Sequence, residues 1–257
     1  MPKFFVSKED ICNNAVTITG EDVSHIKRVL RLKCGDTLQV CDGMGTDYTV
    51  RIENFEKDCI IAGVISSGEN NAEPPIDIIL FQGIPKSDKM DFIIQKSVEL
   101  GVRSIIPVST DRTVVKIANE KDARGKTGRW QKIALEASKQ CNRGIIPHIG
   151  MPVSFEDALK QASKTAELCI IPYEKEKGGF LKPVIKDSKT KRIAVFVGPE
   201  GGFTENEVRR ALDFNIRAVT LGPRILRTET AGIAVISILM YELGDVGDGE
   251  PHICCSR

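Results

Sequence analysis

The stretch that most constrains this chain is residues 193–208, which read IAVFVGPEGGFTENEV. Residues 193–197 form a short apolar run bounded by turn residues, which predicts a buried strand. The glycine-rich run 198–202 predicts a loop, because glycine adopts backbone angles that other residues avoid and proline donates no backbone hydrogen bond. Thr204 and Glu207 have the spacing of a capping box at the start of a helix. A strand, a glycine-rich loop and a helix in this order typically bring bare backbone close to a ligand.

Two further segments repeat the pattern of a strand followed by a loop. Residues 218–221 predict a strand and 222–227 a loop, after which a long apolar helix runs to about residue 243. Upstream, the run 166–174, AELCIIPYE, predicts another strand with its own loop. If these strands are neighbours in one sheet, we expect their loops to lie side by side.

The chain changes character near residue 70. Residues 1–65 contain short β-rich runs and one helix, at 21–30, and a small barrel is the natural way to close so many short strands. The polar residues 66–75, SSGENNAEPP, predict a linker. From residue 76 onward strands alternate with helices, which is typical of a parallel sheet with covering helices. We therefore predict an α/β protein with two domains, residues 1–70 and 76–247.

Charge is unevenly distributed along the chain. The 257 residues have a net charge of +1, which by itself does not suggest a nucleic-acid binder. Between residues 112 and 143, however, there are nine lysines and arginines against three acids, and residues 24–33 contain four basic residues and no acid. Such segments can hold phosphates locally, and the alternative is that they are solvated helix faces.

Several classes of protein do not fit. No apolar run is long enough to span a bilayer. The eight cysteines are scattered without a Cys-x-x-Cys pair and only three histidines are present, so we expect no metal site and a reducing, cytoplasmic location. Neither the Gly-x-Gly-x-x-Gly motif nor the P-loop motif occurs, which argues against a dinucleotide-binding enzyme and an ATPase.

Four blocks of sequence carry a family resemblance. They are SHIKRVLRLKCGD, KSDKMDFIIQKSVELGVRSIIPVSTDR, RWQKIALEASKQCNRGIIP, and GPEGGFTENEV followed by LGPRILRTETAGIAVI. Over nearly its whole length the chain resembles the ribosomal RNA small-subunit methyltransferase E family, in the SPOUT class of S-adenosylmethionine enzymes. The resemblance implies a PUA-like RNA-binding barrel in residues 1–70, a deep trefoil knot in the parallel-sheet domain 76–247, and a homodimer.

The resemblance also implies that S-adenosylmethionine is the cofactor and that loop backbone makes most of its contacts. Apolar cover for the adenine would come from Ile225 and Leu226. The residues expected to bind the cofactor are Ile171, Pro172, Tyr173, Val197, Gly198, Pro199, Glu200, Gly201, Gly202, Leu221, Gly222, Arg224, Ile225, Leu226, Arg227, Thr230 and Ala231.

The implied reaction is methylation of N3 of a uridine in the 16S ribosomal RNA of the small subunit. Glu200 and Glu229 are candidates for a general base, and Arg227 could stabilise negative charge that develops on the uracil oxygens. The alternative interpretation of Glu229 is that its negative charge, in the first turn of a helix, stabilises the helix by interacting with the helix dipole. The residues expected to contact RNA are His25, Arg28, Arg31, Lys86, Lys89, Arg112, Arg129 and Arg143.

Two alternatives stay open from the sequence. In the first, the fold is the same but the reaction differs, for instance ribose 2′-O-methylation, because the loops that bind the cofactor do not identify the group that accepts the methyl. The second is a non-catalytic RNA-binding factor in ribosome assembly that retains the loops. The intact GPEGG and LGPRILRTETA segments favour catalysis over such a binder.

Overall fold

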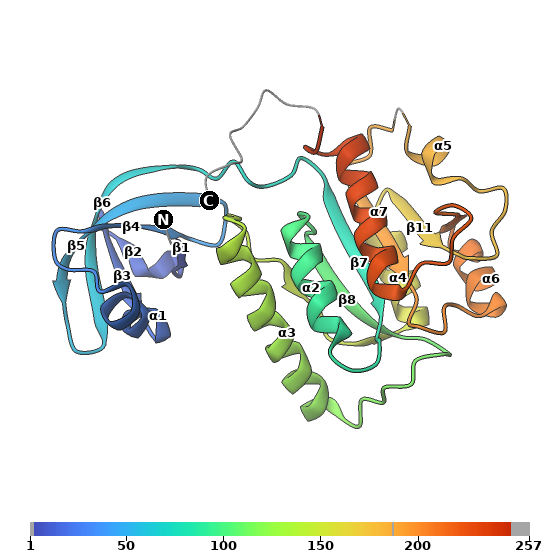
Figure 1. Ribbon diagram of the computed structural model, residues 1–257, viewed down its shortest axis with the longest axis horizontal. Helices are drawn as coiled ribbons and strands as arrows, with labels where there is room; N and C mark the ends of the chain where they lie inside the picture. Colours follow the sequence, from blue (N-terminus) through green and yellow to red (C-terminus); the bar gives the residue numbers. More distant parts are fainter. Residues whose placement is uncertain (1–2, 187, 248–257) are drawn as a thin grey trace. The chain divides into compact units, whose positions relative to one another are not determined.

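The computed structural model describes residues 3–186 and 188–247 (Figure 1). Residues 1–2 of the first predicted domain lie outside this range. Contacts divide the chain into two compact units, the first reaching to Glu73 and including residues 135–146, the second made of residues 74–134 and those from 147 onward. Among the residues described, none of the helices combines the length and apolar character that crossing a membrane would require.

Two segments depart from the predicted linear division of the chain. Residues 135–146, which include the last part of helix α3 (Glu120–Gln140), pack with the first unit rather than the second. Strand β6 runs from Cys59 to Glu69, so residues 66–69 are strand rather than linker. They extend the strand because they pair with residues 46–49 of the neighbouring strand β5.

The sheet of the first unit has the strand order β1-β4-β5-β6-β3-β2 in the described residues. Its alternate side chains are apolar and buried, with Ile18 of β3 and Leu38 and Val40 of β4 at most 1% exposed, as expected for a sheet with one face on a core. A turn at residues 42–45 joins β4 to β5 with Cys41 opposite Asp47. The elements of this unit are β1 (Lys3–Phe5), η1 (Lys8–Asp10), β2 (Ile11–Cys12), β3 (Ala15–Thr19), α1 (Glu21–Ser24), η2 (His25–Leu30), β4 (Thr37–Cys41), β5 (Thr46–Phe55) and β6 (Cys59–Glu69).

The helix predicted near the start of the chain is present but changes form along its length. Glu21–Ser24 is α-helical, whereas His25–Leu30 is a π-helix, which Arg31 ends with a left-handed φ of 55°. In a regular α-helix, their spacing of three would place His25, Arg28 and Arg31 on one face, but this segment is not a regular α-helix. A π-turn is wider than an α-turn, and Arg31 lies outside the helix.

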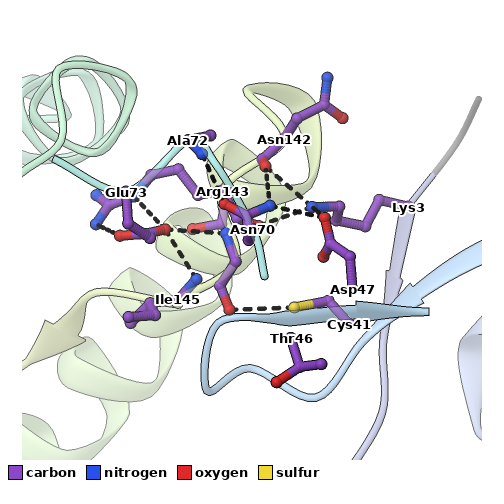
Figure 2. Close-up of polar contacts among 12 residues, drawn as sticks. Lys3, Cys41, Thr46, Asp47, Asn70, Ala72, Glu73, Asn142, Arg143 and Ile145 are labelled. Carbon is purple, nitrogen blue, oxygen red and sulfur yellow. Dashed lines mark hydrogen bonds and ion pairs between the residues drawn. The ribbon is translucent and has the colours of Figure 1, made fainter. Parts of the chain in front are cut away.

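Buried charges hold the residues after α3 against the sheet of the first unit (Figure 2). The ammonium of Lys3 in β1 lies 2.8 Å from Asp47 Oδ2 and donates to the Asn142 carbonyl at 3.0 Å. The side-chain amide of Asn70 donates to the same two oxygens, at 2.8 and 3.1 Å. Because Lys3 is only 4% exposed, these protein acceptors take the place of water around its charge.

Glu73 forms the other half of this cluster (Figure 2). Its carboxylate accepts hydrogen bonds from Arg143 Nη2 at 2.7 Å and from the backbone N–H groups of Gly144 and Ile145, each at 2.9 Å. The Cys41 thiol donates to the Gly144 carbonyl at 3.1 Å. Arg143 is 3% exposed, so its guanidinium lies inside the unit, and the prediction that Arg143 contacts RNA is wrong. These bonds give the physical reason why residues 135–146 pack with the first unit.

The second unit is built on a parallel sheet with the order β10-β8-β7-β12-β11-β13, and β9 also pairs with β8. The three strands predicted to precede the ligand loops, β12, β11 and β13, are consecutive neighbours. The elements of this unit are β7 (Asp77–Gly83), α2 (Lys89–Glu99), β8 (Ser104–Ser109), β9 (His148–Ile149), β10 (Val153–Ser154), α4 (Phe155–Thr165), β11 (Leu168–Pro172), α5 (Leu181–Ile185), β12 (Arg192–Val197), α6 (Glu205–Asp213), β13 (Arg217–Val219) and α7 (Thr228–Leu243).

Helices cover both faces of this parallel sheet, and most residues of its central strands β7, β8 and β12 are accordingly buried. On one face Phe81 and Phe196 stack with ring centroids 4.6 Å apart and pack against residues of α4 and α6. Leu80 and Val195, which are fully buried, alternate with these rings and point to the opposite face. There α2 and α7 contact each other; both helices are labelled in Figure 1.

Replacing Glu73 by alanine is expected to destabilise the first unit. The change removes the carboxylate that faces the buried Arg143 guanidinium and strips two backbone N–H groups of their acceptor. Removing one partner of a buried ion pair costs about 3–5 kcal/mol. Urea unfolding followed by circular dichroism should therefore begin at a lower concentration, whereas Glu69→Ala, which removes an exposed carboxylate, should cost at most about 0.5 kcal/mol. Superimposable curves for the two variants would contradict the assignment.

Candidate functional site

A pocket of about 480 Å³ opens at the carboxyl ends of β11, β12 and β13 in the second unit. Its walls come from three loops, residues 172–174 after β11, 198–203 after β12, and 220–228 after β13 and into α7. Parallel strands place their carboxyl ends at the same edge of a sheet, so these loops meet although they are distant in sequence. The volume is within the range of small-molecule sites.

The loop after β12 is tightly folded and lies close to the end of β7. Gly202 has a φ of 66°, a left-handed conformation that favours glycine, and its N–H donates to the Pro199 carbonyl at 2.9 Å. A Cβ atom on Gly83 would lie 2.6 Å from Pro199 Cδ, so side chains are excluded where β7 meets the loop. The loop therefore presents backbone, not side chains, over much of its length.

Helix α6 and the segment after β8 hold this loop from one side. The predicted capping box is confirmed: the Thr204 hydroxyl accepts from the Glu207 N–H at 3.2 Å, and the Glu207 carboxylate accepts from the Thr204 N–H at 2.8 Å. Glu207 is 5% exposed and also accepts from the Asp111 N–H at 2.9 Å. Arg112 Nη1 donates to the Gly201 carbonyl at 2.5 Å. Arg112, which was expected to contact RNA, thus supports the pocket loop.

A buried hydrogen-bond chain joins the ends of two strands, β7 and β12, to the start of helix α7. Gln82, at the end of β7, is fully buried, and its amide donates to the Thr228 hydroxyl at 3.0 Å. Thr228 is the first residue of α7, and its hydroxyl donates to the Gly198 carbonyl at 2.6 Å. Neither residue is among those predicted from the sequence to form the site. The signal for Gln82 is a polar residue that closes the apolar run IILFQG, at a position where parallel strands bind ligands.

The other two loops present groups that a ligand would satisfy. The Tyr173 N–H donates to the Val219 carbonyl at 2.9 Å, but the Tyr173 hydroxyl is buried and lacks a hydrogen-bond partner among the described residues. Ile225 is 86% exposed although it is apolar. Arg224 and Arg227 also line the pocket, and neither forms an ion pair in the described part of the chain. Buried polar groups normally have partners, so this set indicates a ligand with both polar and apolar parts.

Lys89, the first residue of α2, connects two acidic side chains at the pocket. Its Nζ lies 3.1 Å from Glu200 Oε1 and 3.5 Å from Glu229 Oε2. The hydrogen bond to Glu200 raises the pKa of Lys89 above its usual value, against the effect of desolvation. Burial by itself raises the pKa of Glu200, but hydrogen bonds from its own backbone N–H, from Lys89 and from the Lys86 N–H bring it below its usual value. Lys89 and Glu200 therefore both carry charge at neutral pH.

Most of the residues predicted to bind a cofactor line this pocket, with two exceptions. Ile171 is fully buried within β11, and Thr230 is an exposed residue of α7. The pocket residues that the prediction missed are Lys89, Glu174, Phe203, Thr220 and Thr228. Those predicted and found in the lining are Pro172, Tyr173, Val197, Gly198, Pro199, Glu200, Gly201, Gly202, Leu221, Gly222, Arg224, Ile225, Leu226, Arg227 and Ala231.

The residues predicted to contact RNA have varied surroundings. In the second unit, Lys86 is exposed and its backbone N–H donates to Glu200 at 3.1 Å, while Arg129 of α3 pairs with Asp91. In the first unit, Arg28 and Arg31 are exposed, and the His25 ring packs edge-on against Phe4 with centroids 5.9 Å apart.

None of the cysteines that the structure describes lines the pocket. Burial raises the pKa of both Cys41 and Cys169 to about 11, so both thiols are protonated at neutral pH. Across residues 3–186 and 188–247, no three His, Cys, Asp or Glu side chains gather as metal ligands would. The chemistry of the pocket therefore rests on backbone, arginines and carboxylates.

Comparison with known proteins agrees with this geometry. Residues 72–240 match the family described as RNA methyltransferase domain, and residues 18–64 match the RNA methyltransferase PUA domain. Ribosomal RNA small subunit methyltransferase E of Bacillus subtilis (strain 168) is 37% identical over 231 residues, which cover 88% of this chain and 90% of that protein.

Two solved structures resemble the whole chain. A ribosomal RNA small subunit methyltransferase E from Neisseria gonorrhoeae, bound to S-adenosyl methionine, has a TM-score of 0.84 and 33% identity and covers 96% of this chain and 99% of its own. A methyltransferase from Legionella pneumophila in complex with the same cofactor has a TM-score of 0.85 and 31% identity, with the same coverage of 96% and 99%. By sequence and by fold, the chain belongs to the ribosomal RNA small subunit methyltransferase E family.

Proposed function

We propose that this protein transfers a methyl group from S-adenosylmethionine to N3 of a uridine in the 16S ribosomal RNA of the small subunit. The observation that carries the proposal is the pocket at the ends of β11, β12 and β13, whose lining is largely the backbone of glycine-bearing loops. The names of the relatives support the ribosomal RNA substrate, and two similar structures are described with the cofactor bound. The match to a PUA domain supports RNA binding.

The residues of the pocket fit S-adenosylmethionine. Backbone N–H and C=O groups of the 198–202 loop suit the edge of an adenine, and the exposed Ile225 suits its face. The unpartnered hydroxyl of Tyr173 and the guanidinium of Arg224 suit the polar amino-acid end. When bound, the cofactor supplies a methyl group on a sulfonium, and its leaving group departs neutral without an acid. The work left for the protein is to align the acceptor and accept its proton.

We assign the chemistry on the acceptor to side chains at the start of α7. Arg227 is the N-cap residue of this helix, and its exposed guanidinium stabilises negative charge on the uracil oxygens as N3 loses its proton. Glu229, in the first turn of α7, is the first candidate for the proton acceptor, and Glu200 is the second. A general base contributes about 10²–10⁴ to the rate of such a step.

Further parts of the proposal concern the whole protein. We propose that the first unit closes as a PUA-like barrel that holds RNA with His25, Arg28 and Arg31, and that the three pocket loops form a deep trefoil knot. The apolar helix α7 exposes Ile238 and Tyr241, which supports a homodimer built on this helix. With ribosomal RNA as its substrate, the enzyme works in the cytoplasm.

Arg227→Ala is expected to lower the methylation rate about 10²–10³-fold, because it removes a donor to the charge that develops in the transition state. Transfer of a labelled methyl group to small subunits that lack the modification measures the rate, and circular dichroism checks that the variant folds. Arg209→Ala, which removes an exposed arginine of α6, is the matched control and should remain active. Near-normal methylation by Arg227→Ala would remove this residue from the mechanism.

A strain that lacks this protein is expected to lose 3-methyluridine from its small-subunit RNA. Mass spectrometry of nucleosides from that RNA measures the loss, and a plasmid copy of the wild-type chain should restore the nucleoside while the Arg227→Ala copy should not. Unchanged 3-methyluridine would rule out the proposed reaction. Loss of a 2′-O-methylated nucleoside instead would assign the enzyme to ribose methylation.

A further inference from the structure

We propose that Lys89 is a positioning residue of the methyl-donor pocket. Its ammonium pairs with Glu200 in the 198–202 loop and with Glu229 in the first turn of α7, and these two contacts hold the loop and the helix together. This inference deepens the proposed function, since it rests on the pocket being the site of S-adenosylmethionine. In this role Lys89 does not contact RNA, and Glu200 does not act as the proton acceptor.

Three separate elements meet at the Lys89 ammonium. Lys89 begins α2, Glu200 belongs to the loop after β12, and Glu229 belongs to α7. The three side chains are 35%, 29% and 18% exposed, so water only partly screens their charges. An ion pair that joins different elements restrains their relative positions, unlike a pair within one helix.

The carboxylate of Glu200 is fully used in contacts with Lys89 and with the backbone of Lys86. Besides Lys89, it accepts hydrogen bonds from the Lys86 N–H at 3.1 and 3.3 Å, so both of its oxygens face the segment between β7 and α2. The hydrogen bonds that lower the pKa of Glu200 also make it a weaker proton acceptor. Glu200 thus acts as the anchor by which the loop is held.

Glu229 depends on Lys89 for its charge balance. Its Oε2 atom is buried and accepts no hydrogen bond from the described residues, and the Lys89 ammonium at 3.5 Å is the cation that faces it. A buried carboxylate that loses its cation is costly, and the surrounding structure moves to let in water or a proton. Such movement at Glu229 would displace the start of α7, where Arg227 and Thr228 line the pocket.

The same charges argue against a phosphate contact at Lys89. Two carboxyl groups lie within 3.5 Å of this one ammonium, so its donors already face partners inside the protein. A phosphate group would have to displace these carboxyl groups from Lys89. Lys86, whose side chain is exposed and whose contact to Glu200 uses only its backbone, stays available to RNA.

The test is calorimetric titration of S-adenosylmethionine into the full-length protein, together with separate KM values for the cofactor and for small subunits. Lys89→Met is expected to weaken cofactor binding about tenfold or more, with the KM for RNA unchanged, because it strips a partly buried charge pair of one partner. Lys89→Arg should restore affinity to within about threefold, since arginine also bridges carboxylates. Glu200→Gln should weaken binding in the wild type but add little in the Lys89→Met background, because both changes break the same contact.

Lys96→Met is the matched control, since Lys96 lies on the same helix but pairs with Glu99 at 2.8 Å. It should leave cofactor affinity unchanged. Equal affinity of Lys89→Met and the wild type, or a rise in the KM for RNA alone, would overturn the inference and return Lys89 to RNA contact. Failure of the wild type itself to bind the cofactor would instead refute the proposed function. Should Lys89→Met not fold, Glu200→Gln and Lys89→Arg carry the same test.

Discussion

The pocket depends on one hydrogen bond, from the buried hydroxyl of Thr228 to the carbonyl of Gly198. Gln82 supports it from below by donating to the same hydroxyl. These bonds tie the first residue of α7 to the loop after β12 and to the end of β7, and separating them would leave buried polar groups unpaired, at about 1–3 kcal/mol each. A site lined by backbone needs this rigidity, because backbone contacts cannot adapt by changing rotamer.

Around this bond, charged side chains fix the 198–202 loop from two sides. Arg112 donates to Gly201 from the segment after β8, and Lys89 pairs with Glu200 from the start of α2. The first unit uses the same device where Lys3 and Glu73 hold residues 142–145. Three of the residues expected from the sequence to contact RNA, Arg112, Lys89 and Arg143, instead have partners inside the protein. The sign of a charge can be read from the sequence, but its partner is set by tertiary contacts.

The parts of the fold that could be predicted from the sequence are those set by local patterns. The strand at 193–197, the loop and the Thr204–Glu207 capping box follow from apolar runs, glycines and a spacing of three residues. The sequence could not establish that β12, β11 and β13 are neighbours in one sheet, because strand order depends on long-range pairing. Gln82, Lys89 and Thr228 were missed at the pocket for the same reason. The π-helix His25–Leu30 has no simple signal in the sequence.

A crystal structure of the protein with S-adenosylhomocysteine, the demethylated product of the cofactor, tests the central claim most directly. The account predicts density for this molecule between residues 172–174, 198–202 and 220–227, with Ile225 turned onto it and the Tyr173 hydroxyl partnered. The Thr228–Gly198 hydrogen bond should be unchanged. A ligand bound elsewhere on the chain, or a pocket whose three loops make no contact with it, would contradict the account.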